Sequence, residues 1–389
     1  MKLTYTKRIK IFAGLILACM TMFVSCGNDD PVRAREAAVK HLFKKHKVKV
    51  AVARGFEENQ TEMWNGANLA KEQLNADESI PFEIELVQYD DGGSVLSATR
   101  KAYEIVSDNE ICAVIGHAYS DITLECSIIY QYYGMLLFNC LSTAHKLTER
   151  KNPLVVSNVP DDNLYGDAVA QICVQNGYER ILVYYVRSSW GSALTSDVEV
   201  NCVKNGIVVV ATESFEPHSE ESEHKRIINR WRNNFTFDAV FLAGRMPDLA
   251  VTVKAIRSEG VDCPIIGTDT FDEITFAETL APRESERIFA VSNNNHENQH
   301  PQYQSFINDF VNRYETTPDQ EALQAYDALV VLAKAITEAK SAIPAKVVGK
   351  IKNQEWNEAA GPYFIDENGK NQKKALTKKV FRKGAFVNY

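Results

Sequence analysis

Two kinds of hydrophobic run alternate along the chain from residue 47 onward. Short runs of apolar and β-branched residues are followed by longer amphipathic segments, the pattern of strands joined by crossover helices in a parallel sheet. The first series predicts elements over residues 48–53, 61–75, 82–89, 94–107, 112–115, 120–132 and 135–139. The expected fold class is therefore α/β, with a doubly wound parallel sheet.

After residues 155–157 the same alternation restarts, which indicates a second lobe with its own parallel sheet. Its predicted elements cover residues 166–176, 181–186, 192–205, 207–212, 220–233, 239–242, 248–260 and 265–267. The chain is completed by a strand at 288–291, helices at 301–314 and 320–338, a hairpin signature at 361–370 and a strand at 380–381.

This order predicts two lobes joined by a hinge of three chain stretches. We assign residues 47–157 plus 292–355 to lobe 1, and 158–291 plus 356–389 to lobe 2, so that the hairpin lies on lobe 2. The three hinge stretches are expected at 156–161, 288–293 and 354–361. Ligands in such sheets sit beyond the carboxyl ends of the strands.

The N-terminal segment has the features of an export signal over residues 1–25. Four basic residues precede an apolar run over 11–20 that is too short to span a bilayer. The run leads into Ser25-Cys26-Gly27, which resembles a bacterial lipobox, so Cys26 is expected to carry a lipid anchor. Residues 26–46 are then expected to form a polar tether followed by one helical stretch, with its charges in solvent. The expected location is the Gram-negative cell envelope, on either the periplasmic face or the cell surface.

Charge and cysteine content narrow the function. The formal net charge of −8 becomes −12 once the four basic residues of the signal are removed, which argues against nucleic acid as a partner. Six cysteines remain after Cys19 and Cys26, without a metal-type spacing, and the sequence leaves open whether Cys112 pairs with Cys126 or Cys140.

Several short motifs occur in a characteristic order along the chain. They are Gly66-Ala67-Asn68-Leu69-Ala70, Asp90-Asp91, Ile115-Gly116-His117-Ala118-Tyr119-Ser120 and the segment from Gly361-Pro362 to Gly369. Together they resemble the type I periplasmic binding proteins of the branched-chain amino acid group. The likeness extends over nearly all of residues 47–389. It implies a monomeric protein of two lobes that closes on a small ligand, without cofactor or catalytic residues.

The resemblance also implies ligand contacts on the first lobe. In the family, hydroxyl groups and backbone N–H groups at helix starts hold the ligand carboxylate. Ser120 and Thr143 match these positions, with Tyr119 and Ser142 beside them. The alternative for Ser120 is a plain N-cap.

On the second lobe the family places an acidic residue that binds the ligand ammonium. Asp269 matches that position, with Asp272 or Glu273 as substitutes and a helix cap as the alternative role. Trp190 matches an aromatic residue that covers the ligand, and its alternative is a core position.

One arginine departs from the family pattern, and a second raises the same question about the ligand. Arg245 stands where many members present an aromatic residue, and it either binds a second ligand carboxylate or pairs with Asp248 on the surface. Arg54, after the first strand, raises the same question of a ligand richer in negative charge.

The segment His296-Glu297-Asn298-Gln299-His300 matches the zinc motif of metalloproteases, which would make the protein a hydrolase. That motif requires a helix, and the flanking asparagines and Pro301 argue against one. We therefore expect no metal and no enzyme. The function expected is an extracytoplasmic lipoprotein that captures an amino acid or related solute for an ABC-type permease, with a ligand sensor for a membrane receptor as the alternative.

Overall fold

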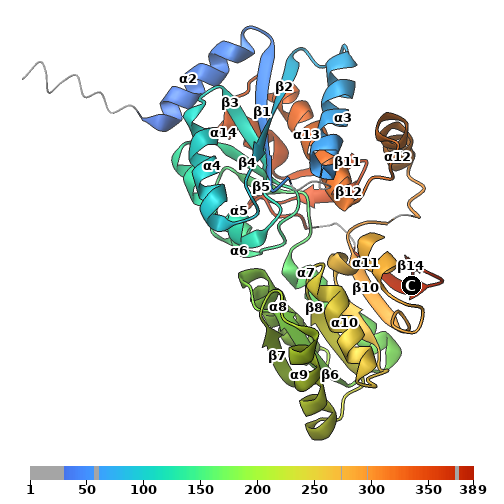
Figure 1. The fold of residues 1–389 in the computed structure, drawn as a ribbon. Helices are drawn as coiled ribbons and strands as arrows, with labels where there is room; N and C mark the ends of the chain where they lie inside the picture. The colour runs from blue at the N-terminus through green and yellow to red at the C-terminus, as the bar shows by residue number, and fades with distance from the viewer. Residues whose placement is uncertain (1–29, 57–60, 273, 296, 373–375) are drawn as a thin grey trace, which may run out of the picture.

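The computed structural model describes residues 30–56, 61–272, 274–295, 297–372 and 376–389, and they form two lobes (Figure 1). The first lobe is built on a parallel sheet in the order β2-β1-β3-β4-β5. Its strands are β1 (Lys47–Arg54), β2 (Glu83–Asp90), β3 (Ile111–Gly116), β4 (Leu136–Asn139) and β5 (Val155–Ser157). The α/β class and the parallel sheet of this lobe are confirmed.

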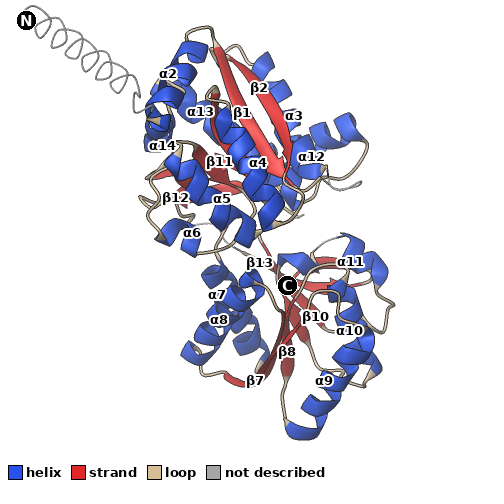
Figure 2. Cartoon of the chain, turned by 60° about the vertical axis from the view of Figure 1, so that its left-hand side comes forward, coloured by secondary structure: helices blue, strands red, loops and turns tan. Residues whose placement is uncertain are grey.

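Helices cover both faces of the first sheet (Figure 2). They are α2 (Pro31–Phe43), α3 (Glu62–Ala76), α4 (Val95–Ser107), α5 (Ser120–Tyr132), α6 (Lys146–Glu149), α12 (Pro301–Tyr314), α13 (Gln320–Ala339) and α14 (Pro344–Ile351). Strand β1 shows why helices pack on both faces of the sheet. Val50 and Val52 join the core under α3 and α13. Ala51 and Ala53 join the core on the other face, under α4 and α5. Alternate residues of a strand point to opposite faces, so a strand apolar at every position is buried on both.

The second lobe has a seven-stranded sheet in the order β14-β13-β10-β9-β8-β6-β7. Its strands are β6 (Arg180–Val186), β7 (Val208–Phe215), β8 (Ala239–Ala243), β9 (Ile265–Gly267), β10 (Ile288–Ser292), β13 (Thr377–Arg382) and β14 (Ala385–Asn388). Five strands are parallel, and β13 and β14 extend the sheet in antiparallel pairing. The helices are α7 (Asp162–Asn176), α8 (Ser189–Lys204), α9 (Glu221–Asn234), α10 (Asp248–Ser258), α11 (Ile274–Thr279) and the short 3₁₀ helix η1 (Asp269–Phe271).

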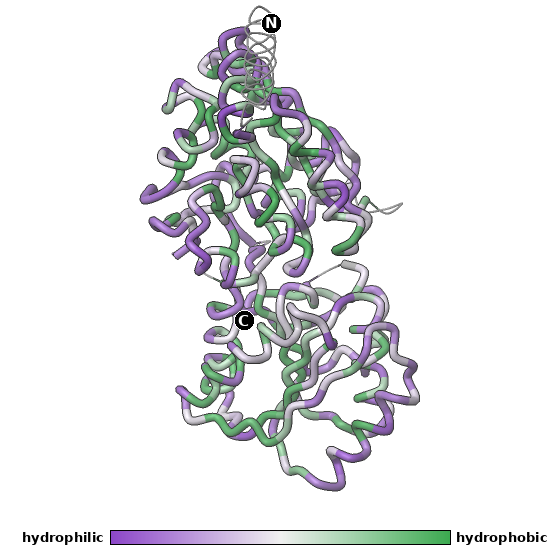
Figure 3. The backbone as a smooth tube through the Cα atoms, turned by 90° about the vertical axis from the view of Figure 1, so that its left-hand side faces the viewer, coloured by the Kyte–Doolittle hydropathy of each residue, from purple (hydrophilic) through white to green (hydrophobic). Residues whose placement is uncertain are grey.

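Apolar segments concentrate inside each lobe, and polar segments follow the outer surface (Figure 3). Each lobe thus has its own core, as expected for a chain with enough apolar residues for two domains. Among the described residues, no helix has the length and apolar character needed to cross a membrane.

The expected position of the C-terminal hairpin on lobe 2 is wrong. Strands β11 (Gln354–Glu358) and β12 (Gly361–Ile365) form a hairpin whose Trp356, Tyr363 and Ile365 lie in the core of the first lobe. The chain joins the second sheet only at β13. The third crossing therefore follows residue 371 instead of lying at 354–361, because the hairpin side chains complete the first core.

The other two crossings lie close to the expected stretches. The first runs from β5 to α7 and is held by hydrogen bonds from Ser157 N to Gly369 O (2.8 Å) and from Asn371 Nδ2 to Asn158 O (2.7 Å). The second runs from the end of β10 to α12, whose Tyr303, Phe306 and Phe310 pack against the first lobe with α3 and α13 residues.

Within residues 26–46 the expected helical stretch is present, but the expectation that all of the charges lie in solvent is wrong. Residues 31–43 form helix α2, which begins at Pro31 behind the N-cap Asp30. Arg35 of this helix is fully buried, and its guanidinium donates to the carbonyl oxygens of Tyr133, Asp108, Ile111 and Val106 at 2.7 to 3.0 Å. Helix α2 is therefore part of the first lobe. Cys26 and the expected signal lie outside the described residues.

Candidate ligand site between the lobes

The loops after β3 and β4 bring the expected first-lobe hydroxyls together. Ser120 and Ser142 are both buried, and the Ser142 hydroxyl donates to Oγ of Ser120 at 3.1 Å. Ser120 is the first residue of α5, and Tyr119 is its N-cap, so the plain N-cap interpretation of Ser120 is wrong. The carboxyl ends of neighbouring parallel strands meet at one edge, which explains why residues 22 positions apart touch.

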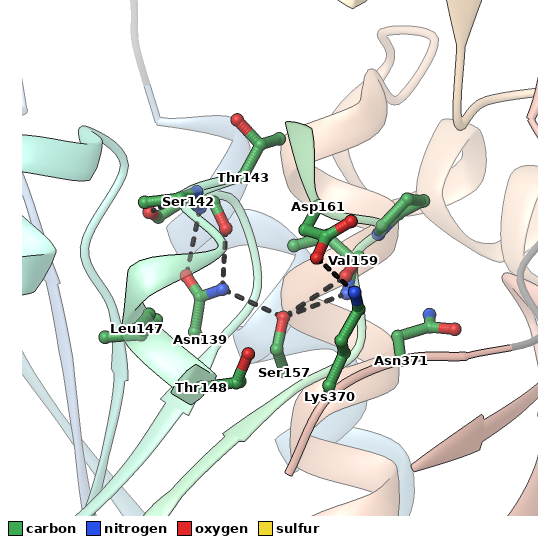
Figure 4. A pocket seen from close by; sticks show the side chains of 12 residues that line it. Asn139, Ser142, Thr143, Leu147, Thr148, Ser157, Val159, Asp161, Lys370 and Asn371 are labelled. Carbon is green, nitrogen blue, oxygen red and sulfur yellow. Dashed lines mark hydrogen bonds and ion pairs between the residues drawn. The ribbon is translucent and has the colours of Figure 1, made fainter. Parts of the chain in front are cut away.

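Asn139, the last residue of β4, fixes the conformation of the loop that carries Ser142 and Thr143 (Figure 4). Its side chain accepts from Ser142 N (2.9 Å) and donates to Ser142 O (2.7 Å) and to Oγ of Ser157 (2.9 Å). These residues line a small hollow with Asp161 and Lys370, which form an ion pair at 2.5 Å. The first-lobe side of the site is therefore held by neutral hydrogen bonds before any ligand arrives.

A buried charged pair lies directly beneath the loop of Tyr119 and Ser120. His117 is fully buried, with Nδ1 at 2.6 Å from Asp91 Oδ2 and Nε2 at 2.9 Å from the Tyr130 hydroxyl. Burial is the largest single influence and disfavours the charged ring, but the interactions with Asp91 and Cys126 together outweigh it and raise the pKa of His117 to about 9. The ring is therefore an imidazolium at neutral pH, with both N–H groups engaged.

On the second lobe, Arg245 links the expected aromatic residues of both lobes. Its guanidinium carbon lies 4.3 Å from the ring centroid of Tyr119 and 4.7 Å from that of Trp190. Trp190 is buried at the start of α8 and belongs to the second core. Asp248 accepts two hydrogen bonds of 3.0 Å from the backbone N–H of His218. The geometry thus places Arg245 at the mouth of the site.

Asp269 is the first residue of η1 and faces the interface between the lobes. Its Oδ2 accepts from the Tyr165 hydroxyl (3.2 Å) and from Gln320 Nε2 (3.3 Å), and Gln320 belongs to the first lobe. Burial raises the pKa of the Asp269 carboxyl, and the hydrogen bonds only partly offset this effect. Thr268 is the N-cap of η1, so the helix-cap interpretation of Asp269 is wrong.

The two substitutes for Asp269 have different outcomes. Asp272 is occupied by Lys379 of β13 at 2.6 Å and accepts from the Ser292 hydroxyl at 2.7 Å. A carboxylate that is already neutralised and hydrogen-bonded has little to offer a ligand ammonium. Glu273 lies outside the described residues.

Arg54 is buried at the end of β1, and its charge is matched within the protein. Its Nε donates to Oε2 of Glu321 at 2.5 Å, its Nη2 pairs with Oε1 of the same carboxylate, and its Nη1 donates to Gly55 O at 2.6 Å. Burial opposes the charged guanidinium, but Glu321 outweighs it, and the pKa of Arg54 is raised. The cation that the sequence suggested for a ligand richer in negative charge is thus already engaged by Glu321.

Three further side chains, which the sequence did not indicate as a site, meet between the lobes. His145 Nδ1 lies 3.1 Å from Asp197 Oδ2, and Asp162 lies beside them. Asp162 is fully buried, and burial raises the pKa of its carboxyl well above the ordinary range despite the nearby Thr143 hydroxyl. The doublet Asp161-Asp162 before a helix was the one available signal, but an N-cap explains only Asp161, which accepts from Leu164 N.

The metalloprotease-like segment is not helical where it is described. Residues 297–300 precede α12, and His300 is the N-cap of that helix. His296 lies outside the described residues. Two histidines one helical turn apart are the requirement of that motif, and the geometry at 297–300 does not meet it.

The described cysteines do not form disulfides. Cys112, Cys126, Cys140, Cys173 and Cys202 are buried free thiols, and Cys263 is partly buried. Burial raises the pKa of Cys112 and of Cys173 to about 12, so these thiols stay protonated and pack as small apolar groups. The pairing of Cys112 with Cys126 or Cys140, left open by the sequence, is not present.

Comparison with known proteins yields many similar solute-binding proteins. The chain is 25% identical over 308 residues to the leucine-, isoleucine-, valine-, threonine- and alanine-binding protein of Pseudomonas aeruginosa, covering 78% of this chain and 80% of that protein. It is 22% identical over 308 residues to the Leu/Ile/Val-binding protein of Escherichia coli, covering 79% of this chain and 82% of that protein.

A solved structure shares the fold. The ABC transporter substrate-binding protein of Desulfitobacterium hafniense, in complex with Leu, superposes with a TM-score of 0.78 at 23% identity, covering 88% of this chain and all of that chain. The periplasmic binding protein family matches residues 55–384, which include most of both lobes and all three crossings. The chain therefore belongs to the periplasmic binding protein family, whose members are extracytoplasmic solute-binding proteins and not enzymes.

Proposed function

We propose that this protein captures an amino acid, or a related solute with one amine and one carboxylate, and delivers it to an ABC-type permease. The observation that carries the proposal is the division of polar groups across the interface. Two touching hydroxyls stand at a helix start on the first lobe, and an incompletely compensated carboxylate of the second lobe lies at the interface, where it accepts from Gln320 of the first. The relatives from Pseudomonas aeruginosa and Escherichia coli are named for amino acid ligands, which supports the same solute class.

In the proposed mechanism the ligand docks first on the hydrogen-bonded lobe. Ser120, Ser142 and Thr143 receive the ligand carboxylate, aided by the N–H groups that open α5. Asp269 of the second lobe then binds the ammonium, and an ammonium near this buried carboxylate favours its charged form. Trp190, Tyr119 and Arg245 close the mouth of the site and exclude water.

We assign Arg54 a positioning role instead of a direct ligand contact. Its bidentate bond to Glu321 joins the end of β1 to the start of α13, the helix that also presents Gln320 to Asp269. Arg245 keeps the role of contact to the distal end of the ligand. A guanidinium is the group that binds carboxylates in a planar, bidentate manner, and this one lies against a ring of each lobe.

We further propose that Cys26 carries the lipid that anchors the protein to the envelope. The support is the apolar run followed by Ser25-Cys26-Gly27. Mass spectrometry of the protein from membranes tests this. The expected N-terminal peptide begins with a diacylated Cys26, and Cys26→Ala moves the protein to the soluble fraction. An unmodified N-terminus at another residue would contradict the anchor.

A calorimetric and thermal-shift screen of the purified protein against amino acids, dicarboxylates and small amides tests the ligand class. A ligand that binds only the native state raises the melting temperature by mass action. We expect one group of amino acids to bind saturably, and Asp269→Asn to weaken that binding at least about 30-fold, because an unpaired buried ammonium costs about 2 kcal/mol or more.

The matched control is Asp262→Asn, which removes an exposed carboxylate from the same lobe and leaves binding unchanged. If dicarboxylates alone bind, or if Asp269→Asn binds amino acids as well as the wild type does, the assignment of Asp269 to the ligand ammonium is wrong.

A further inference from the structure

His145, Asp162 and Asp197 form a cluster that the amino acid site does not use. One ligand atom from each side chain can be chosen so that all three atoms lie within 4.8 Å of one another. His145 follows β4 on the first lobe, whereas Asp162 opens α7 and Asp197 lies within α8 on the second. The cluster therefore spans the interface between the lobes.

Asp162 provides an independent sign that this cluster holds a ligand. Its relative exposure is 1%, and neither carboxylate oxygen has a hydrogen-bond partner among the described residues. The Thr143 hydroxyl lies near enough to favour the charged carboxylate without completing a hydrogen bond. A buried carboxylate without a partner is strongly unfavourable, so such groups in native proteins take up a proton, pair with a cation or bind a metal.

The charged neighbours do not supply that cation within the described residues. Asp161 is matched by Lys370 at 2.5 Å, and two further charged groups that act on the cluster, Asp269 and Glu149, are acidic. With a neutral imidazole the cluster carries up to two negative charges. A divalent ion would balance both.

The donor set selects the class of ion. One imidazole nitrogen with two carboxylates suits zinc and similar divalent transition metals, whereas calcium and magnesium prefer sites made of oxygen only. We propose that His145, Asp162 and Asp197 bind one divalent transition-metal ion, with zinc as the best match, and that the ion joins the two lobes.

A metal at this place would favour the closed arrangement. Its ligands come from both lobes, so it binds the arrangement in which they are close more tightly than one in which they are apart. The backbone N–H of Asp162 also donates to Thr143 O at 2.9 Å, which places the metal beside the loop proposed to hold the solute carboxylate. Metal and solute are thus expected to bind cooperatively.

Titration of chelator-treated protein with zinc chloride, followed by calorimetry, tests the proposal. We expect one ion per chain, and binding at least about tenfold weaker in Asp162→Asn, Asp197→Asn and His145→Gln. His218→Gln is the matched control, since this exposed histidine also pairs with a carboxylate, Asp248, but lies away from the cluster. Unchanged zinc affinity in all three cluster variants would overturn the site.

A second measurement does not depend on the variants folding. Anomalous X-ray diffraction from wild-type crystals soaked with zinc locates the ion directly. Density between His145, Asp162 and Asp197 supports the proposal, whereas density at His300 or at a cysteine, or no ordered ion, overturns it. Solute binding is measured separately in chelating buffer, where no metal ion is bound. Failure of the metal site is therefore distinguishable from failure of the amino acid site.

Discussion

The two faces that meet at the ligand site are built differently. On the first lobe, Ser120 and Ser142 are neutral and tied to each other, and the buried charge beneath them, His117, has Asp91 as a partner. On the second lobe, Asp162 and Asp269 are carboxylates whose pKa values burial raises. The first face is complete without a ligand, whereas the second needs a cation. The first lobe therefore sets the geometry of the site, and the second lobe provides the buried negative charge that a cationic group must balance.

Removal of the buried pair of the first lobe is expected to have the largest effect on stability. Asp91→Ala leaves a buried imidazolium without its partner, and we expect the free energy of unfolding to fall by about 3–5 kcal/mol. Urea denaturation measures it. Glu216→Ala is the control, because its pair with Arg187 is more than half exposed and contributes less than about 1 kcal/mol. Equal losses in both variants would show that the first face is not held by this pair.

A pH series tests the same pair without mutating it. The folded pKa of His117 is about 9 and its unfolded value is 6.5, so its stabilisation is complete below pH 6.5 and is lost as pH rises through 9. The free energy of unfolding should fall by up to about 3 kcal/mol across that window. His117→Gln should abolish this part of the pH dependence. A wild-type profile that is flat from pH 6.5 to 9 would contradict a charged His117.

On the second face, removal of a buried charged group is expected to raise the free energy of unfolding instead of lowering it. Asp162→Asn removes a buried carboxylate without a partner, so in chelating buffer at pH 7 it should stabilise the protein by about 1 kcal/mol. Because the folded pKa of Asp162 is raised, the gain should vanish below the unfolded pKa of 3.8, where the carboxyl is protonated in both states. Thermal and urea unfolding measure the change. If the variant is less stable than the wild type at pH 7, Asp162 does have a stabilising partner in the folded protein.

The smallest effect concerns the contact between the faces. Tyr119→Leu removes one of the two rings on Arg245, a contact worth about 0.5–1 kcal/mol, so ligand dissociation should be up to about fivefold faster. Stopped-flow release of a bound amino acid measures this rate. Tyr314→Leu is the control, since its ring contacts Arg313 inside the first lobe and should leave the release rate unchanged.

Much of the fold was predictable because it depends on local pattern. The strand and helix alternation places Ser120 and Ser142 after neighbouring parallel strands, and their contact follows from that topology alone. The hairpin at β11 and β12 was recognised as a hairpin but assigned to the wrong lobe. Its alternation predicts a buried face without saying which core that face completes.

The charges of the site could not be predicted in the same way. Arg54 and Glu321 are 267 positions apart, and His145, Asp162 and Asp197 come from three separate segments. Burial of Arg35 in a run of charged residues was equally hidden, because its partners are backbone carbonyls with no signature in the sequence. Pairing across the fold, and not residue type, decides whether such a charge faces solvent, a ligand or the protein.

If Cys26 carries the proposed lipid, the burial of Arg35 determines which lobe stays with the membrane. Helix α2 is fixed to the first lobe, and in the lipid-anchored form proposed above the chain from Cys26 to Pro31 spans at most about 18 Å. The first lobe is then held near the bilayer in a restricted set of orientations, while the second lobe moves. Encounter with a permease in the same membrane becomes a search in two dimensions by a molecule that already presents a constant face, and its effective concentration rises accordingly.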